Sequence, residues 1–339
     1  MKKRITAAAV SLGIILILFF AAPFEKRLYS DSRIAMDTVV TISVVSRSQE
    51  KAQKAFDTAY AELNRLSGLI NFYSDKSEIS AINRSAGLKA VKVSPDTLNL
   101  IKESIKASDT TQGAFDPTTG VMTILWNFPN KVKPEDKEIR SRLNLVSAKD
   151  IVLDEKNGTV FLRKKGMMID LGGIAKGYAA DRTIEILSSL GVKAALVSVA
   201  GDIRGYGVKP DGQPWKIGIQ DPRPQKPSNN VMAALSLKDR AISTSGDYQR
   251  YFEIDGVRYH HILDPKTGMP ARGCQSVTVL ADRGVTADSL ATGVFVLGPR
   301  RGLELLKKLR YDGVIVDDNG QVFVTEGLGK DIEIKRINQ

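Results

Sequence analysis

Cysteine and histidine are nearly absent from this sequence of 339 residues. The one cysteine, Cys274, excludes an intramolecular disulfide, and because no motif surrounds it we expect an inert thiol. The missing disulfides leave the cellular compartment open, since many exported bacterial proteins contain none. Histidine occurs twice, as the adjacent pair His260 and His261, so any imidazole chemistry depends on these two positions.

Basic runs interleaved with aromatic residues are also absent, although Lys and Arg outnumber Asp and Glu by 49 to 38. The cations are spread along the chain, which argues against a nucleic-acid partner. The net charge of +11 remains compatible with an anionic membrane surface or an anionic substrate. Hydrophobic residues at 42% and charged residues at 26% are ordinary for a globular protein, and the length suits one large domain or two modest ones.

The N-terminus holds an apolar run over residues 5–24, which follows three basic residues. Its length is about that of a bilayer span, and the positive-inside rule would export everything after it. Cleavage after Ala22 would put Phe20 where a small residue is needed, so we favour an uncleaved anchor over a cleaved signal peptide. No cysteine directly follows the run, which excludes a lipoprotein anchor. We therefore expect residues 1–30 to form a membrane anchor or signal segment.

Beyond this run, strand-like and helix-like patterns alternate irregularly, which favours an α+β fold over a doubly wound parallel sheet. We expect mixed, largely antiparallel sheets with packed helices. Asn157 and Gly158 predict a hairpin between residues 151–156 and 159–164. The expected helices cover residues 48–70, 77–82, 95–112, 139–145, 175–190, 285–297 and 299–309. The other expected strands cover residues 33–46, 195–200, 215–220, 233–237, 251–254, 259–263, 276–281, 313–316 and 321–325.

The sequence IDLGGIAKGYAADR, residues 169–182, runs from the end of a buried strand through two glycines into a helix. A glycine turn before a helix N-terminus can bind an anion, because free N–H groups and the positive end of the helix dipole point outward together. Lys176 adds a positive charge there and Asp170 a negative one. The alternative is a plain strand–helix connection, since the stretch matches neither the P-loop pattern nor GxGxxG.

The two histidines lie in YHHILDPKTGMP. Neighbouring residues on a strand point to opposite faces, so at most one of them can face a site. Asp264 and Pro265 predict a tight turn that would hold this strand end rigid, and a histidine there can accept a proton near neutral pH. The alternative is a pair of surface histidines.

On the helix expected over residues 285–297, Asp288 and Thr292 would lie one turn apart on one face. A carboxylate and a hydroxyl so placed suit Mg²⁺, which takes oxygen ligands together with waters or phosphate oxygens. The alternative is a charge at the helix N-terminus and a packing residue.

Two further features have two interpretations each. Residues 241–246, AISTSG, would either bind phosphate or ribose or form an ordinary polar turn. Three loop aromatics would either stack on a planar ring or fill the edge of the core: Tyr73, Phe115 and Trp126.

Taken from its residues alone, the chain is an exported, tethered α+β domain with a candidate Mg²⁺–phosphate site and a candidate histidine base. This combination suggests phosphoryl-type chemistry on a nucleotide-like ligand.

Eight motifs follow one another in the order typical of the ApbE family, the FAD:protein FMN transferases, and the chain resembles that family over residues 31–336. The motifs are Met36-Asp37-Thr38, NFYSDKSEIS, GAFDPTTG, IDLGGIAKGYAAD, VSVAGDIRGYG, AISTSGDYQRYF, HHILDPKTGMP and TADSLATGVFVLG. The resemblance implies an ApbE-like domain over residues 31–339, on the extracytoplasmic side of a bacterial cell membrane.

The resemblance also implies the chemistry. The expected enzyme depends on Mg²⁺, binds FAD and transfers its FMN half to a Thr or Ser of an exported acceptor, typically a subunit of a membrane redox complex, with release of AMP. His261 is implied as the catalytic base, and the implied metal ligands are Asp288, Thr292 and the backbone carbonyl of Gly173. FAD contacts are implied at Met36, Tyr73, Ala114, Phe115, Asp116, Asp170, Lys176 and Ile262.

Two departures from the family pattern stand out. Asp37 takes the place of the glycine in the usual Met-Gly-Thr, and a side chain beside the flavin could change the affinity for FAD. Many members are lipoproteins, whereas this chain lacks the cysteine that carries the lipid. Two other functions stay open: a hydrolase that cleaves FAD to FMN and AMP, and an exported FAD-binding protein without catalysis.

Overall fold

The computed structural model of the chain describes residues 26–224 and 231–328, and the backbone of residues 332–334. The expected membrane anchor over residues 5–24 lies outside these residues. None of the helices in the described ranges combines the length and the apolar character needed to cross a bilayer.

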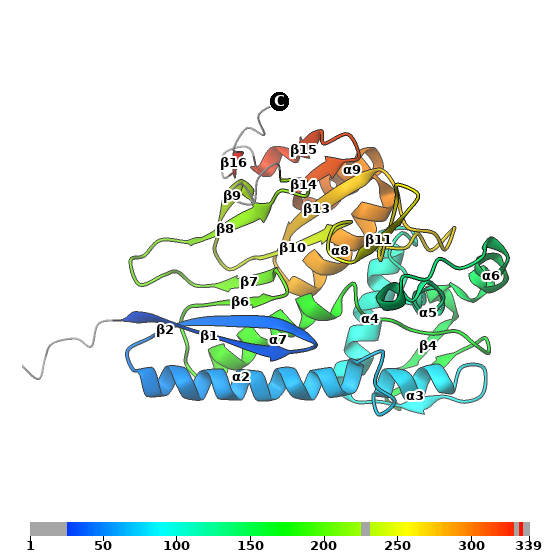
Figure 1. Cartoon of the computed structure of the whole chain (residues 1–339). Helices are drawn as coiled ribbons and strands as arrows, with labels where there is room; N and C mark the ends of the chain where they lie inside the picture. The colour runs from blue at the N-terminus through cyan, green and yellow to red at the C-terminus, as the bar shows by residue number, and fades with distance from the viewer. Residues whose placement is uncertain (1–25, 225–230, 329–331, 335–339) are drawn as a thin grey trace, which may run out of the picture.

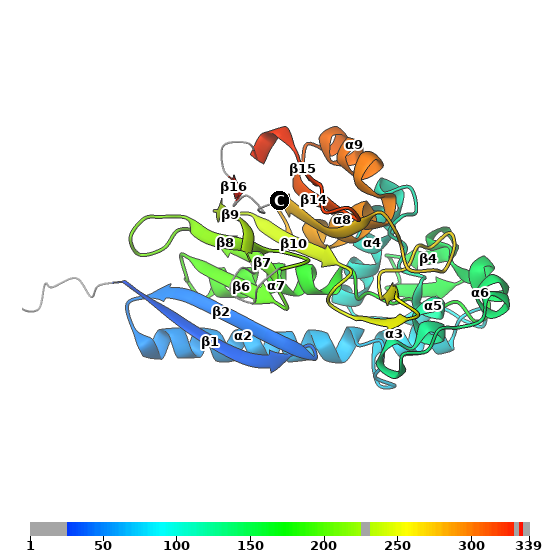
Figure 2. The same cartoon turned by 45° about the horizontal axis from the view of Figure 1, so that its top comes forward.

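The largest element is an eight-stranded antiparallel sheet with the strand order β1-β2-β6-β7-β10-β13-β14-β15. Figure 2 shows β1, β2, β6, β7 and β10 side by side in this order. The bounds are β1 (Arg27–Ala35), β2 (Thr38–Ser46), β6 (Ala195–Val199), β7 (Asp202–Tyr206), β10 (Ala241–Gly246), β13 (Cys274–Ala281), β14 (Asp312–Asp317) and β15 (Val322–Val324). With helices packed on this sheet, the expected α+β class is confirmed.

Four helices cover one face of this sheet: α2 (Gln49–Ile70), α7 (Ala175–Ser189), α8 (Gly284–Leu297) and α9 (Pro299–Leu309). Apolar residues of β2 and β6 pack against α2 and α7, and those of β13 and β14 pack against α8 and α9. The opposite face packs against a three-stranded sheet of order β16-β9-β8, formed by β8 (Trp215–Gln220), β9 (Val231–Leu237) and β16 (Ile332–Ile334). Because strand side chains alternate between faces, Ile242 of β10 faces the small sheet while Ser243 faces the helices.

A second group of elements lies at one end of the large sheet, on the right in Figure 1. It contains α3 (Glu78–Arg84), α4 (Pro95–Thr110), α5 (Gly120–Trp126), α6 (Asp136–Arg142) and a three-stranded sheet, β3 (Val91–Lys92), β5 (Thr159–Leu162) and β4 (Ile151–Asp154). Among the described residues, short 3-10 turns lie at η1 (Phe128–Asn130), η2 (Leu143–Leu145), η3 (Ala148–Asp150) and η5 (Glu326–Leu328).

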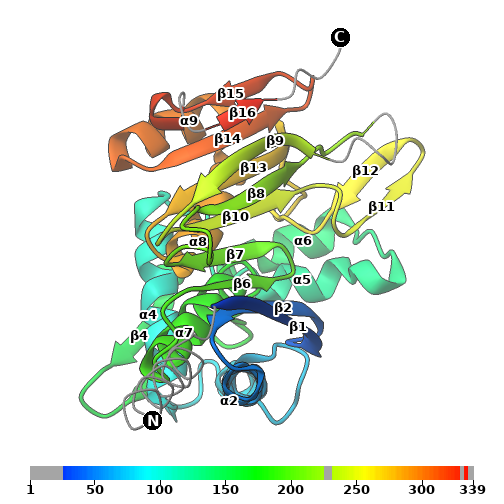
Figure 3. The same cartoon turned by 90° about the vertical axis from the view of Figure 1, so that its left-hand side faces the viewer.

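The hairpin of β11 (Tyr251–Ile254) and β12 (Val257–His260) joins the two groups. Figure 3 shows it beside α5 and α6. Tyr259 packs on the fully buried Trp126 with 5.6 Å between ring centroids, and Phe252 packs there as well. The end of β12, and with it the histidine pair, therefore lies where the large sheet meets the second group.

The expected long helices and the hairpin around Gly158 are confirmed, but three expectations were wrong. The strand expected over residues 33–46 is a hairpin, because Met36 and Asp37 both have positive φ (53° and 58°) and reverse the chain between β1 and β2. AISTSG is the central strand β10 rather than a turn. The stretch before the glycine pair is buried, yet it forms only a single bridge, between Met168 and Thr119.

Smaller differences concern elements without a strong sequence signal. Helix α5, strand β7 and strand β16 were not expected. The inward face of α7 includes Thr183 and Leu187, whereas Leu190, the last residue of the expected helix, follows α7 and is 45% exposed.

Candidate active site

The segment before α7 is held by helix α3 and by the loop that contains Pro117. The side-chain amide of Asn83 makes two hydrogen bonds to the backbone of Ile169. It accepts from the N–H at 2.7 Å and donates to the carbonyl at 2.9 Å. The N–H of Asp170 donates to the carbonyl of Pro117 at 2.8 Å. These bonds fix the glycine turn that follows, and α7 begins at Ala175 as expected.

Gly173 lies where three segments touch. A Cβ at this position would be 3.1 Å from Thr292 Oγ1 and 3.2 Å from Phe115 Cε2, so a larger residue would force these neighbours to move. The N–H of Gly177 donates to Asp288 Oδ2 at 2.9 Å instead of to the carbonyl of Gly173 four residues back. The carbonyl of Gly173 therefore does not accept the usual helical hydrogen bond from Gly177.

Helix α8 presents Asp288 and Thr292 one turn apart, as expected from their spacing. The helix starts against α7, where the carboxylate of Asp181 accepts the N–H groups of Gly284 and Val285 at 2.7 and 3.0 Å. This satisfies two free donors of the first turn and fixes α8 relative to α7. Asp288 is 2% exposed, and its burial raises the pKa of the carboxyl group to about 6.

Lys176 connects α7 to two buried carboxylates. Its ammonium group contacts Asp202 and lies 3.3 Å from Asp288 Oδ1. Burial by itself would lower the pKa of Lys176, but the two negative charges outweigh it and raise that pKa above its usual value. The second oxygen of Asp202 accepts a hydrogen bond from the hydroxyl of Ser243 on β10.

The sequence motifs did not identify Asp202 as a residue of the site. It is 3% exposed and follows a two-residue turn in which Ala200 and Gly201 have positive φ, 52° and 93°. A carboxylate placed directly after a buried strand and a glycine turn is the signal that could have identified it.

The hydroxyl groups of AISTSG divide between the two faces of β10. Ser245 lies with its Oγ 3.2 Å from Thr292 Oγ1, on the same face as Ser243. Thr244 points to the other face, where its hydroxyl pairs with Thr278 at 2.8 Å. Two of the three hydroxyls therefore face the candidate site.

The histidine pair has two different environments. His260 is buried; it accepts the N–H of Ile262 at Nδ1 (3.3 Å), and its Nε2 lies 2.8 Å from the carbonyl of Ala271, which fits a neutral ring that donates through Nε2. His261 is half-buried, with Nδ1 3.3 Å from the carbonyl of Arg250. Burial and the positive charges of Arg250 and Lys176 lower the pKa of His261 well below its usual value. The ring of His261 is therefore neutral near pH 7.

The rim of the site carries an exposed aromatic ring. Tyr73 is 69% exposed and makes an edge-to-face contact with Phe72, with 5.1 Å between centroids. Partial burial of its hydroxyl and the charge of Asp170 raise the pKa of Tyr73, while Arg250 opposes this. Asp170 in turn accepts a hydrogen bond from Thr123 at 3.1 Å.

The hairpin turn that carries Met36 is tied to the same rim. Asp37 accepts a hydrogen bond from the side-chain amide of Asn71 at 3.0 Å, and the other end of that amide accepts the N–H of Tyr73 at 2.9 Å. Met36 itself is half-buried against the core under the turn. Asp37 adopts the left-handed conformation that the usual glycine would favour, which Asp tolerates better than most residues.

Other expected contact residues have side chains that belong to the core. Ala114, Phe115 and Ile262 are at most 6% exposed, and Trp126 is fully buried. The carboxylate of Asp116 accepts the N–H groups of Thr118 and Ala148 at 2.8 and 2.9 Å, and burial raises its pKa. These positions offer mainly backbone atoms to a ligand.

The donor set at Gly173, Asp288 and Thr292 consists of oxygens only. Within residues 26–224 and 231–328, no group of three or more His, Cys, Asp or Glu side chains is placed to hold a metal ion. A metal here would thus depend on one carboxylate, a hydroxyl and a carbonyl. This set fits Mg²⁺, which commonly uses one or two carboxylates and completes its shell with waters and substrate phosphates.

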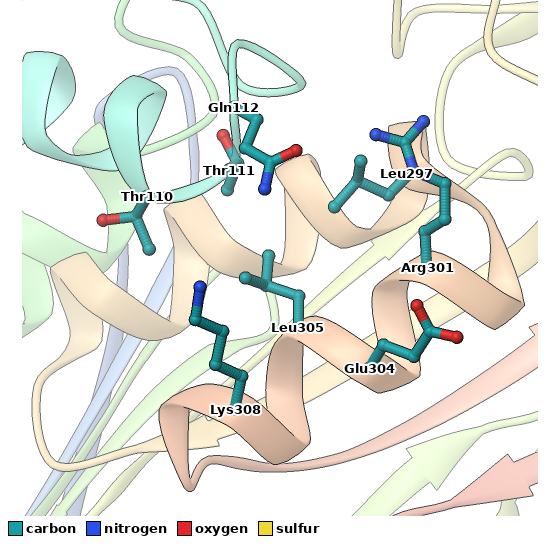
Figure 4. A pocket seen from close by; sticks show the side chains of 8 residues that line it. All are labelled: Thr110, Thr111, Gln112, Leu297, Arg301, Glu304, Leu305 and Lys308. Atoms are coloured by element: carbon teal, nitrogen blue, oxygen red, sulfur yellow. The ribbon is translucent and has the colours of Figure 1, made fainter.

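A surface hollow of about 210 Å³ lies elsewhere, between the end of α4 and helix α9 (Figure 4). Two cations, Arg301 and Lys308, stand opposite Thr110 and Gln112, with Glu304 between them in the sequence. The hollow shares no residue with the candidate site.

Comparison with known proteins gives consistent results. The model of the ApbE family matches residues 36–315. An FAD:protein FMN transferase of Vibrio cholerae is 36% identical over 255 residues, 73% of this chain and 75% of that protein. One of Haemophilus influenzae is 32% identical over 336 residues, 96% of each chain. Among solved structures, the ApbE protein of Thermotoga maritima has a TM-score of 0.83 and 37% identity, and the flavin transferase ApbE of Vibrio cholerae has 0.78 and 30%. Each covers 89% of this chain and 98% of its own.

Proposed function

The chain belongs to the ApbE family, and on this basis we propose that it moves the FMN moiety of FAD onto a Thr or Ser of an exported acceptor protein, with Mg²⁺ and with release of AMP. The chain is an enzyme of the FAD:protein FMN transferase type, and FAD is its substrate. The observation that carries the finer proposal is the buried group of Lys176, Asp202 and Asp288, the last of which lies on the helix that also carries Thr292. The charge of Lys176 contributes to the lowered pKa of His261.

The proposed reaction exchanges the phosphoanhydride bond of FAD for a phosphate ester bond to the acceptor. The hydroxyl oxygen of the acceptor forms a bond to the phosphorus of the FMN half. The bond from that phosphorus to the bridging oxygen breaks, and AMP leaves with the bridging oxygen. The hydroxyl proton passes to His261, whose lowered pKa keeps the ring in its proton-accepting form at neutral pH. General base catalysis of this kind contributes about 10²–10⁴-fold.

The negative pyrophosphate of FAD repels an attacking oxygen, so the site must offset its charge. Lys176 offers a permanent ammonium charge. Asp288, Thr292 and the carbonyl of Gly173 would hold Mg²⁺ beside it. When bound, this ion would neutralise the phosphate oxygens and stabilise the leaving phosphate.

Tyr73 and Met36 would contact the flavin. The Tyr73 ring is exposed at the rim and can stack on a planar ring system, and Met36 lies in the hairpin turn tied to the same segment. Asp170 and the backbone at Ala114, Phe115, Asp116 and Ile262 would complete the FAD contacts.

We propose that this reaction takes place outside the cytoplasm. The apolar run over residues 5–24 and the three basic residues before it support a tether in the bacterial cell membrane, with the described domain exported. The acceptor would then be an exported flavin-carrying protein, such as a subunit of a redox complex.

Incubation of the full chain with FAD, Mg²⁺ and an acceptor domain tests the proposal. We expect the acceptor to gain the mass of the FMN moiety while AMP is released, and an acceptor with its Thr replaced by Ala to gain none. Release of AMP and FMN without added mass would instead identify an FAD pyrophosphatase. Binding of FAD without either product would identify a non-catalytic carrier.

A further inference from the structure

Two buried carboxylates share one ammonium group at the candidate site. Asp202 is 3% exposed and Asp288 is 2% exposed, and Lys176 contacts both. The three groups together carry one uncompensated negative charge. Buried charge of this kind is costly unless a further positive charge arrives, which favours a cation as the missing partner.

The ammonium group is not shared equally. Its shorter contact is with Asp202, whereas it lies 3.3 and 3.4 Å from the two oxygens of Asp288. Asp202 is itself held by the hydroxyl of Ser243 and by the β6–β7 turn. The tighter partner of Lys176 is thus fixed to the sheet, and the looser partner is the carboxylate on α8.

A cation on Asp288 competes with Lys176 for the same oxygens. If Asp202 were neutral, the ammonium group would have Asp288 as its only charged partner in the cluster and would hold it more tightly. Because the shorter contact of Lys176 is with Asp202, the oxygens of Asp288 remain available to a second cation.

We propose that Asp202 is a positioning residue that draws Lys176 away from Asp288 and so allows Asp288 to bind a divalent cation. The inference rests on the proposed function in one respect, that Asp288 is a metal ligand. With the cation bound, the two carboxylates and the two cations leave one net positive charge, which suits the pyrophosphate of FAD. Asp202 acts only through Lys176 and touches no substrate.

The proposal makes opposite predictions for two substitutions. Asp202→Asn keeps the size of the side chain but removes its charge, so the affinity for a divalent cation should fall by roughly tenfold or more, given one unit charge at this short range. Lys176→Met removes the competing cation, so the affinity should be unchanged or higher. In the double variant, Asp202→Asn should no longer cause the full loss of affinity for the cation. No ammonium group then remains to compete for the oxygens of Asp288.

Binding of Mn²⁺ alone to the full chain, without FAD, measures this directly through the electron paramagnetic resonance signal of the free ion. Mn²⁺ prefers the same oxygen ligands as Mg²⁺. Asp312→Asn is a matched control, because it removes a carboxylate charge that pairs with Arg240 away from the site, and it should leave Mn²⁺ binding unchanged. Circular dichroism confirms that each variant is folded.

Asp288→Asn tests the metal site itself, independently of the role of Asp202. Loss of Mn²⁺ binding in Asp288→Asn, together with weaker binding in Asp202→Asn and recovery in the double variant, supports the inference. Two results would overturn the inference and leave the metal assignment intact, provided that Asp288→Asn loses Mn²⁺ binding. One is wild-type Mn²⁺ binding in Asp202→Asn, and the other is a double variant that binds Mn²⁺ as weakly as Asp202→Asn. Wild-type binding in Asp288→Asn overturns both.

Discussion

Replacing Gly177 with alanine would place a methyl group where α7 and α8 touch. The new carbon would lie 2.1 Å from the carbonyl oxygen of Gly284 and 2.8 Å from Cβ of Asp288, whereas ordinary contacts begin at 3.4 Å. The obstacle is backbone, so it cannot rotate away, and the helices must separate by on the order of 1 Å. The same separation would lengthen the bond from the Gly177 N–H to Asp288, which is now 2.9 Å.

The expected magnitude follows from these two effects. Overpacking in a tight core costs about 1–3 kcal/mol, and a lost hydrogen bond to a charged group costs about 1.5–3 kcal/mol. We therefore expect Gly177→Ala to lower the free energy of unfolding by about 3–5 kcal/mol, and to weaken divalent cation binding in the protein that remains folded.

Urea unfolding measures the first effect, with Gly68→Ala as the control. Gly68 is exposed on α2 with nothing within 4 Å of its Cβ position, so alanine there should raise stability by roughly 0.5–1 kcal/mol through helix propensity. The close crossing of α7 and α8 would be refuted if Gly177→Ala unfolded at the same urea concentration as the unmodified chain.

Three further predictions concern His261, His260 and Tyr73. At saturating Mg²⁺, the rate of acceptor flavinylation should stay constant as the pH falls through 6.5, because the pKa of His261 is well below that value; an acid limb centred at 6.5 or above would contradict this. Burial also lowers the pKa of His260, so as the pH falls His260 takes up a proton in the unfolded chain before it does so in the folded chain. The free energy of unfolding should therefore fall below pH 6.5 by up to about 1.4 kcal/mol per pH unit. Urea unfolding of His260→Gln should lack this part of the pH dependence. Tyr73→Ala should weaken FAD binding by about 0.5–1.5 kcal/mol while Tyr73→Phe should not, as measured by flavin fluorescence, and equal affinities would remove Tyr73 from the flavin contact.

The long helices could be predicted because their signals are local. Helix α2 begins after Ser48, whose side chain caps it, and its buried residues repeat with the helical period. Strand β10 could not be predicted in this way. Its Ser243 and Ser245 are buried because they face Asp202 and Thr292, and a polar residue that is buried for such a reason resembles a turn in the sequence.

The candidate site was predictable in part. The spacing of Asp288 and Thr292 predicted their common face on α8, and the family motifs pointed to Lys176 and His261. The partnership of Lys176 with Asp202 depends on how β7 lies beside α7, and no local pattern encodes that contact. The close approach of Gly173 to Thr292 is likewise a property of the assembled fold.

The central claim is that His261 takes the proton in a transfer of FMN from FAD to an acceptor hydroxyl. The most direct measurement counts AMP released and acceptor flavinylated in the same reaction, for the full chain and for His261→Ala, alongside the FAD affinity of each. We expect one AMP per flavinylated acceptor for the unmodified chain, and for His261→Ala an unchanged FAD affinity with transfer slowed by about 10²–10⁴-fold. Transfer by His261→Ala at the unmodified rate would contradict the account.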